Sequence, residues 1–142
     1  MKQRLLYDNL IKKTDEKEGV FILKIQKSAE DYLETMLMLH KSRGFIRSID
    51  IAEHLGVTKP SVSYATKRLR ENGYITMEKD GLITLTQTGL DIAENMYVRH
   101  KLLTEFFVSL GVSEEVARED ACKIEHDISV ETFEAIRKAL EK

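Results

Sequence analysis

The sequence predicts a mainly α-helical protein that is interrupted once by a short β-hairpin. Only one proline and seven glycines occur in 142 residues, and apolar residues recur at helical spacing over most of the chain. The exception is YITMEKDGLITLT (74–86), in which Ile, Thr and Tyr surround Asp80-Gly81. That pair is typical of a two-residue hairpin turn. The chain is long enough for one domain, or for two small domains that share a helix.

Six helical segments are expected, and serine N-caps, glycine stops and one first-turn proline (Pro60) set their limits. The expected caps are Ser28, Ser48, Ser113 and Ser129, and the expected stops are Gly44, Gly56 and Gly73. The segments are SAEDYLETMLMLHKSRG (28–44), SIDIAEHLGV (48–57), TKPSVSYATKRLRENGY (58–74), QTGLDIAENMYVRHKLLTEFFVSLGV (87–112), SEEVAREDACKIEHDI (113–128) and SVETFEAIRKALEK (129–142).

The remaining features concern compartment and the N-terminus. Residues 1–27 combine a short helical pattern with a charge run, and we expect an N-terminal extension there. The longest apolar runs have four residues, such as VFIL and MLML, which is too short to span a bilayer, and a signal-peptide core is missing. A single cysteine, Cys122, excludes an internal disulfide framework and suits a reducing compartment. These features predict a cytoplasmic protein with no membrane partner.

Charge is distributed unevenly, although the formal net charge is only -2. The segment 59–70 holds four basic residues and no acidic residue, whereas the segment 114–134 holds eight acidic residues and two basic ones. The middle of the chain therefore suits a polyanion, and the C-terminal third suits cations.

Two short helices joined by GVT, followed by a hairpin, predict a winged helix-turn-helix. A tight glycine turn lets the second helix project, small polar residues at its start can approach base edges, and Lys and Arg suit phosphates. KRLRENG alone could be a solvated helix face, but the turn and the hairpin around it favour binding of double-stranded DNA. The expected base-edge residues are Thr58, Pro60, Ser61 and Tyr64, and the expected phosphate contacts are Lys67, Arg68, Arg70 and Lys79 of the wing.

The segment ACKIEHDIS places three potential metal ligands on one helix face. Cys122, Glu125 and His126 stand at i, i+3 and i+4. One helix supplies three ligands at most, so a metal site needs further groups from elsewhere in the fold.

The further candidates are Asp31 and Glu34, at i and i+3 on the first helix, and His100 in the long helix. Each also has a structural interpretation. Asp31 can be a first-turn charge, Glu34 a solvated helix residue, and His100 a satisfied structural histidine.

Together, SAEDYLETMLML, the helix-turn-helix, the wing, YVRHKLLTEFF and ACKIEHDIS occur in the order seen in the DtxR/MntR family of metal-dependent transcriptional repressors. The resemblance covers residues 28–140 and is to short members without the SH3-like domain. It implies a homodimer with a winged helix-turn-helix domain (28–91) and a helical metal-binding and dimerisation domain (92–142), preceded here by the extension 1–27. The positions it implies as metal ligands are Asp31, Glu34, His100, Cys122, Glu125 and His126, and those it implies at the major groove are Thr58, Pro60, Ser61 and Tyr64.

The ligand set combines two branches of the family. Cys122 is similar to the iron branch, whereas Asp31 is similar to the manganese branch. We therefore expect Mn²⁺ or Fe²⁺ as the signal, with Zn²⁺ and Co²⁺ also binding in vitro.

The expected function is repression of metal-homeostasis genes through a palindromic operator, with the metal bridging the two domains. A metal-independent winged-helix regulator remains an alternative. A metal hydrolase is a weaker one, because a nucleophile motif and a glycine-rich loop are missing, and we expect no enzymatic activity.

Overall fold

The structure is a computed structural model of the chain, and it describes residues 27–142. The expected N-terminal extension lies outside the described residues except for Lys27. The described part is mainly helical with a small two-stranded antiparallel sheet, which confirms the expected fold class. Its elements in chain order are α3 (Lys27–Arg43), α4 (Ser48–Leu55), α5 (Lys59–Glu71), β1 (Ile75–Met77), β2 (Ile83–Leu85), α6 (Gln87–Ser109), α7 (Glu114–Ile124) and α8 (Val130–Leu140).

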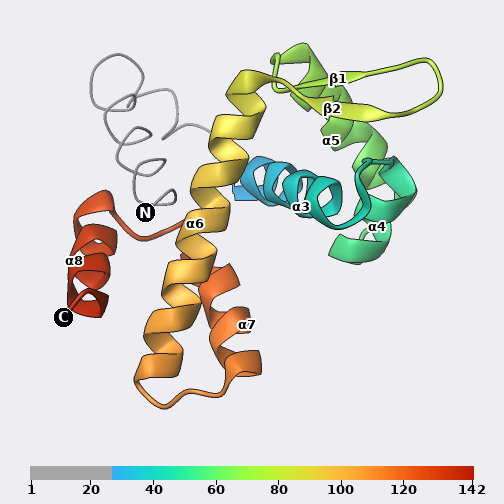
Figure 1. The fold of residues 1–142 in the computed structure, drawn as a ribbon. Helices are drawn as coiled ribbons and strands as arrows, with labels where there is room; N and C mark the ends of the chain where they lie inside the picture. The colour runs from blue at the N-terminus through green and yellow to red at the C-terminus, as the bar shows by residue number, and fades with distance from the viewer. Residues whose placement is uncertain (1–26) are drawn as a thin grey trace.

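The winged helix-turn-helix is built around α3. This helix packs against α4, α5 and α6, with the wing above (Figure 1). Leu33 and Met36 of α3 and Ile51 of α4 are completely buried, and Val62 and Ile75 join the same apolar cluster. Because apolar residues of α3 face both α4 and α6, this helix connects the winged unit to the rest of the molecule.

The N-caps differ in part from the expectation. Ser129 caps α8 and accepts a hydrogen bond from a backbone N–H three residues on, at 3.1 Å. Ser113 occupies the N-cap of α7 without a side-chain bond. Ser48 is already helical because the extended Arg47 (φ -128°, ψ 150°) holds the cap position. Ser28 is also inside its helix, so the expectation of N-caps at Ser28 and Ser48 was wrong.

The wing turn is longer than the two-residue turn expected. Met77 pairs with Ile83, which leaves five residues between the strands. Within them Gly81 N–H donates to the carbonyl of Glu78 at 2.9 Å, and the N–H of Glu78 donates to the carbonyl of Leu82 at 2.9 Å. Gly81 has φ 89°, a left-handed conformation that favours glycine. The two strands therefore form a hairpin with a five-residue loop, in which Gly81 takes the left-handed position.

The long helix α6 runs from beside the wing to the far end of the molecule (Figure 1). It crosses the expected domain limit at residues 91 and 92, and α7 and α8 pack against it. Leu103, Ala117, Ala121 and Phe133 are completely buried in this second packing region. No helix within residues 27–142 is both long and apolar enough to cross a membrane.

Candidate metal centre and nucleic-acid interface

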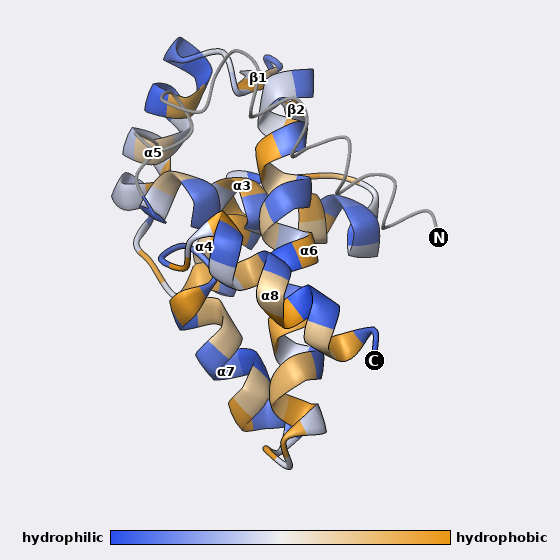
Figure 2. Cartoon of the chain, turned by 90° about the vertical axis from the view of Figure 1, so that its left-hand side faces the viewer, coloured by the Kyte–Doolittle hydropathy of each residue, from blue (hydrophilic) through white to orange (hydrophobic). Residues whose placement is uncertain are grey.

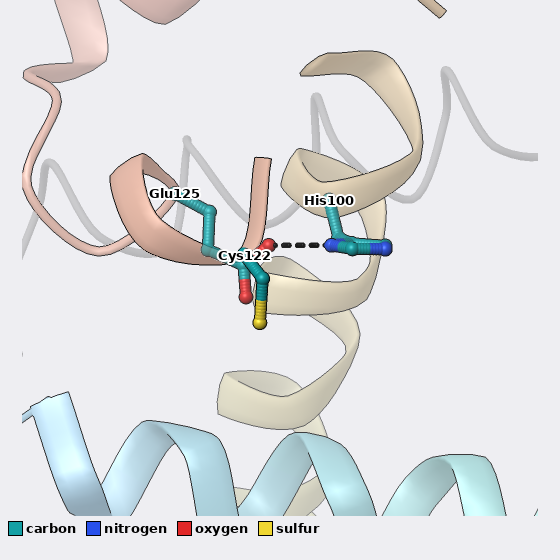
Figure 3. A group of neighbouring side chains, drawn as sticks. All are labelled: His100, Cys122 and Glu125. Carbon is teal, nitrogen blue, oxygen red and sulfur yellow. Dashed lines mark hydrogen bonds and ion pairs between the residues drawn. The ribbon is translucent and has the colours of Figure 1, made fainter. Parts of the chain in front are cut away.

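The end of α7 carries the first group of metal-ligand side chains. Cys122 and Glu125 face His100 of α6 (Figure 3), and His100 Nδ1 lies 2.9 Å from Glu125 Oε2. Each of the three residues offers one ligand atom, and these atoms all lie within 4.8 Å of one another. The helical spacing i, i+3 brings the thiol and the carboxylate to the same face, which is the face toward α6.

A second group joins the same end of α7 to α3. It contains Asp31, Glu34, Glu125 and His126, whose ligand atoms also lie within 4.8 Å of one another. His126 Nε2 lies 2.7 Å from Asp31 Oδ1 and 3.4 Å from Glu125 Oε1. The structure thus brings all six candidate residues into two groups that share Glu125.

The carboxylates of Glu34 and Glu125 are withdrawn from water. Glu34 is 6% exposed, and burial, followed by its hydrogen bond to Glu125 and that residue's charge, raises the pKa of Glu34 to about 8. Burial is also the main reason that the pKa of Glu125 rises to about 7. Near neutral pH this pair therefore holds protons that an incoming cation would displace.

The other donors respond to the same surroundings. Burial, together with nearby carboxylates of which Glu125 is the strongest, raises the pKa of the Cys122 thiol to about 11. Burial lowers the pKa of His100. Burial also acts to lower the pKa of His126, but the carboxylates of Asp31 and Glu30 beside its ring outweigh burial and raise this pKa to about 10.

The donor set fits a divalent transition-metal ion. Glu125 Oε1 and His126 Nε2 are buried, and neither makes an aligned hydrogen bond within residues 27–142, despite their close neighbours. Buried polar atoms without such bonds are rare, and a bound ion is one of the explanations that account for them. Carboxylates suit Mn²⁺, whereas imidazole and thiolate suit Fe²⁺, Co²⁺ and Zn²⁺.

Sequence reasoning did not identify Glu30 or Arg99 as neighbours of this centre. Glu30 Oε2 lies 3.4 Å from His126 Nδ1, the ring nitrogen opposite the one that faces Asp31. Its position next to Asp31 in the first turn of α3 was the only available signal. Arg99 lies beside His100 and contacts the backbone of Glu125, which no sequence pattern indicates.

The start of α5 holds the expected base-edge residues. Thr58 is the N-cap, its hydroxyl accepts the N–H of Ser61 at 3.3 Å, and the two hydroxyls lie 2.9 Å apart. Pro60 stands in the first turn and is exposed. Tyr64 is 64% exposed, and its hydroxyl accepts a hydrogen bond from Arg68 at 3.1 Å. This end of the helix therefore presents small polar groups and one aromatic ring to solvent.

The expected phosphate contacts are all exposed. Lys67, Arg68 and Arg70 lie on α5, and Lys79 lies in the wing turn. Arg70 Nη1 is 3.9 Å from the sulfur of Met77 in β1, so the basic end of α5 lies next to the wing.

Two family models match consecutive parts of the chain. The model described as the iron dependent repressor N-terminal DNA binding domain matches residues 24–82. The model described as the iron dependent repressor metal binding and dimerisation domain matches residues 86–142. The transcriptional regulator MntR of Escherichia coli O6:H1 is 39% identical over 108 residues, which cover 76% of this chain and 70% of that protein.

The chain belongs to the DtxR/MntR family of metal-dependent transcriptional repressors.

Other relatives and solved structures agree. The MntR regulator of Bacillus subtilis is 37% identical over 109 residues, with 77% of each chain covered. A manganese-dependent transcriptional repressor solved in complex with manganese matches with a TM-score of 0.74 and 30% identity over 80% of this chain and 52% of that one. The T. acidophilum IdeR structure matches with a TM-score of 0.70 and 26% identity, covering 80% and 54% of the two chains. This chain thus spans about half the length of those two solved proteins. The relatives do not favour the metal-independent regulator or the hydrolase.

Proposed function

We propose that this repressor responds to Mn²⁺ or Fe²⁺ and that, with the cation bound, a homodimer binds a palindromic operator that controls metal-homeostasis genes. Its winged unit (28–91) would read DNA, and its helical part (92–142) would dimerise. The residues that would hold the cation are Asp31, Glu34, His100, Cys122, Glu125 and His126.

The convergence of two structural units on Glu125 carries this proposal. Asp31 and Glu34 extend from α3, the central helix of the winged unit. The other donors come from α6 and from the last residues of α7 and those that follow it. A cation held by both sets would fix the winged unit relative to the helices that follow it.

Without a cation, the acidic groups oppose this arrangement. Glu34 and Glu125 lie together in a buried region beside Asp31, and ionisation of both glutamates is unfavourable there. The imidazole of His126 offsets part of this charge through its contact with Asp31. A bound divalent ion would supply the remaining positive charge. The metal-free protein should therefore be looser at the junction of α3 and α7.

The energy available is sufficient for a switch. Changing a two-state equilibrium from 1:99 to 99:1 requires a differential binding free energy of about 5.5 kcal/mol. Structural metal sites contribute on the order of 10 kcal/mol at neutral pH, so part of one such site suffices. Since Mn²⁺ and Fe²⁺ bind less tightly than Zn²⁺ to the same donors, most of the available donors should be needed.

Thr58, Pro60, Ser61 and Tyr64 would approach base edges in the major groove. Lys67, Arg68, Arg70 and Lys79 would contact phosphates. In a dimer, the spacing of the two α5 helices must match half-sites roughly 34 Å apart, one helical turn of DNA. Fixing the winged unit relative to the dimerising helices is the step that sets this spacing.

An apolar surface at the far end of α6 and α7 suits a second copy of the chain. The turn between these helices is largely apolar (Figure 2), and Val108, Leu110 and Val116 are 43%, 66% and 45% exposed. Exposed apolar side chains that gather at one end of a molecule are typical of a protein–protein interface. This surface lies away from α5 and the wing, so a dimer formed there would leave both reading units free (Figure 1).

The proposal is tested with palindromic DNA selected from a random pool in the presence of Mn²⁺. Mn²⁺ or Fe²⁺ should raise the affinity for that DNA by about 100-fold or more, and a chelator should reverse the effect. Glu125→Gln should remove the response, whereas Glu114→Gln, an exposed acidic residue of α7 that belongs to neither donor group, should retain it. Specific binding that persists after exhaustive chelation would overturn the proposal.

A further inference from the structure

Arg99 is a buried cation at the point where α6 meets the end of α7. Its side chain is 8% exposed. Arg99 Nη1 donates to the backbone carbonyl of Glu125 at 2.9 Å and to that of Ile128 at 3.1 Å. Its guanidinium carbon lies 5.4 Å from the ring centre of Phe133 in α8. One side chain thus ties α6 to the end of α7 and to the start of α8.

These contacts fall where backbone groups lack helical partners. α7 ends at Ile124, with Glu125 as its C-cap, and the last carbonyls of a helix have no N–H within the helix to accept from. A positive charge is favourable at a helix C-terminus, and charged donors form the stronger hydrogen bonds. Arg99 therefore anchors the chain at two points after it leaves α7.

The carbonyl of Glu125 belongs to the peptide unit that joins Glu125 to His126. Holding that carbonyl, together with the carbonyl of Ile128, fixes the backbone of the segment 125–128, which carries both side chains. In the structure Glu125 points to His100 on α6, and His126 points to Asp31 on α3. The two side chains start from adjacent positions, reach different helices and still meet, since His126 Nε2 lies 3.4 Å from Glu125 Oε1. A shift of the backbone that carries them would therefore misplace both.

We propose that Arg99 is a positioning residue of the metal site, one that holds the backbone of the segment 125–128 so that the Glu125 and His126 side chains face their partner donors before a cation arrives. This inference rests on the proposed function. Arg99 contacts no cation itself, because a guanidinium is always protonated and has no lone pair to donate. Its burial and its place in α6 also separate it from the DNA-reading residues of α5 and the wing.

A purely structural cap and a positioning residue predict different results. If Arg99 is only a structural cap, its replacement lowers the stability of the metal-free protein but leaves the saturated metal site unchanged once the chain is folded. If Arg99 is a positioning residue, its replacement alters the metal site itself. The absorption spectrum of bound Co²⁺ separates the two, because its ligand-field and thiolate bands report donor identity and geometry at saturation.

The test uses the full chain with Arg99→Met and Arg99→Lys, and with Arg43→Met as a control. Arg43 forms an ion pair with Asp50 in the winged unit, and neither residue belongs to the donor groups. Arg99→Met should bind Co²⁺ about 10- to 100-fold more weakly than the wild type, with altered bands at saturation. Arg99→Lys keeps the charge but lacks the planar guanidinium, so the Co²⁺ affinity of this variant should lie between that of Arg99→Met and that of the wild type. Arg43→Met should match the wild type.

A folded Arg99→Met with wild-type affinity and bands overturns the inference. If Arg99→Met does not fold, Arg99→Lys decides, and wild-type behaviour of that variant overturns the inference in the same way. Failure of the proposed function itself is recognised separately, since the wild-type chain would then bind its selected DNA equally with and without metal. A wild type that responds to metal, together with unchanged Arg99 variants, contradicts only the role of Arg99.

Discussion

His126 Nε2 lies 2.7 Å from Oδ1 of Asp31, and this contact joins the second residue after the end of α7 to the first turns of α3. The two residues are far apart in the sequence, and they belong to the two segments that the DNA-binding and the metal-binding family models match. The other ring nitrogen of His126 lies 3.4 Å from Glu30. A histidine held between carboxylates in this way is typical of metal sites, where a second acidic group fixes the ring and raises its basicity.

Mn²⁺ affinity should fall as the pH decreases from about 8 to 6. Glu34 and Glu125 have pKa values raised to about 8 and about 7, so both gain protons across this range. Each proton that must leave reduces affinity by up to about tenfold per pH unit below its pKa. The part of the loss that comes from these two glutamates should therefore steepen toward about 100-fold per unit once both are protonated. It adds to a steady loss from His126 and Cys122, whose pKa values are raised to about 10 and about 11 and which carry protons throughout this range. Competition with a chelating dye at each pH measures the loss, and a slope that stays the same from pH 8 to pH 6 would show that these carboxylates are not ligands.

Cys122 should determine metal preference. Cys122→Glu replaces a soft donor with a hard one that keeps the negative charge, so Mn²⁺ should activate DNA binding as well as in the wild type. Co²⁺ and Zn²⁺ should lose part of their advantage, and the thiolate band of bound Co²⁺ should disappear. Cys122→Ala is the matched variant with no donor, and it should weaken activation by every metal. Wild-type curves for both variants would remove Cys122 from the site.

DNA reading should be separable from metal sensing. Lys67→Ala and Arg68→Ala should each weaken binding to all DNA sequences and reduce the slope of log affinity against log salt by about one unit. Tyr64→Ala should instead change sequence preference, because its ring is exposed at the start of α5. Arg68→Ala also removes the hydrogen bond to Tyr64, so Lys67→Ala is the cleaner test of phosphate contact. Mn²⁺ affinity, measured without DNA, should stay at the wild-type value in all three; a parallel loss would mean that the two functions are wrongly assigned.

Gly89→Ala should destabilise the junction between the wing and α6. A Cβ at Gly89 would lie 2.0 Å from the carbonyl oxygen of Tyr74, which also accepts the N–H of Thr86 at 3.0 Å. In an open helix the same change would stabilise by up to about 1 kcal/mol. Here overpacking against backbone should outweigh that gain and lower the free energy of unfolding by about 1–3 kcal/mol. Thr88→Ala, at an exposed neighbouring position, is the control in urea denaturation, and a more stable Gly89→Ala would show that the contact is easily relieved.

Much of the fold could be predicted from local patterns. The glycine turn, the basic third helix and the β-rich stretch predicted the winged unit, and helical spacing placed Cys122, Glu125 and His126 on one face. The meeting of that face with Asp31 and Glu34 came from the family resemblance, since it depends on how α3, α6 and α7 pack. Local patterns also fail where backbone geometry decides: Arg47 replaced Ser48 as a cap because its backbone is extended. The contact of Arg99 with two backbone carbonyls has no sequence signal, because carbonyls are present at every residue.

The central claim is that one metal site connects α3 to α7, and a variant that lacks only the α3 donors tests it most directly. The double variant Asp31→Ala, Glu34→Ala keeps the group of His100, Cys122 and Glu125, so it should still bind Co²⁺ with a thiolate band. Its affinity for the selected DNA should nevertheless stay at the metal-free level when Co²⁺ is saturating, because the winged unit is no longer held. Anisotropy of labelled DNA measures this affinity against the wild type. Activation of the double variant to the wild-type level would contradict the account, since it would show that metal controls DNA binding without joining the two units.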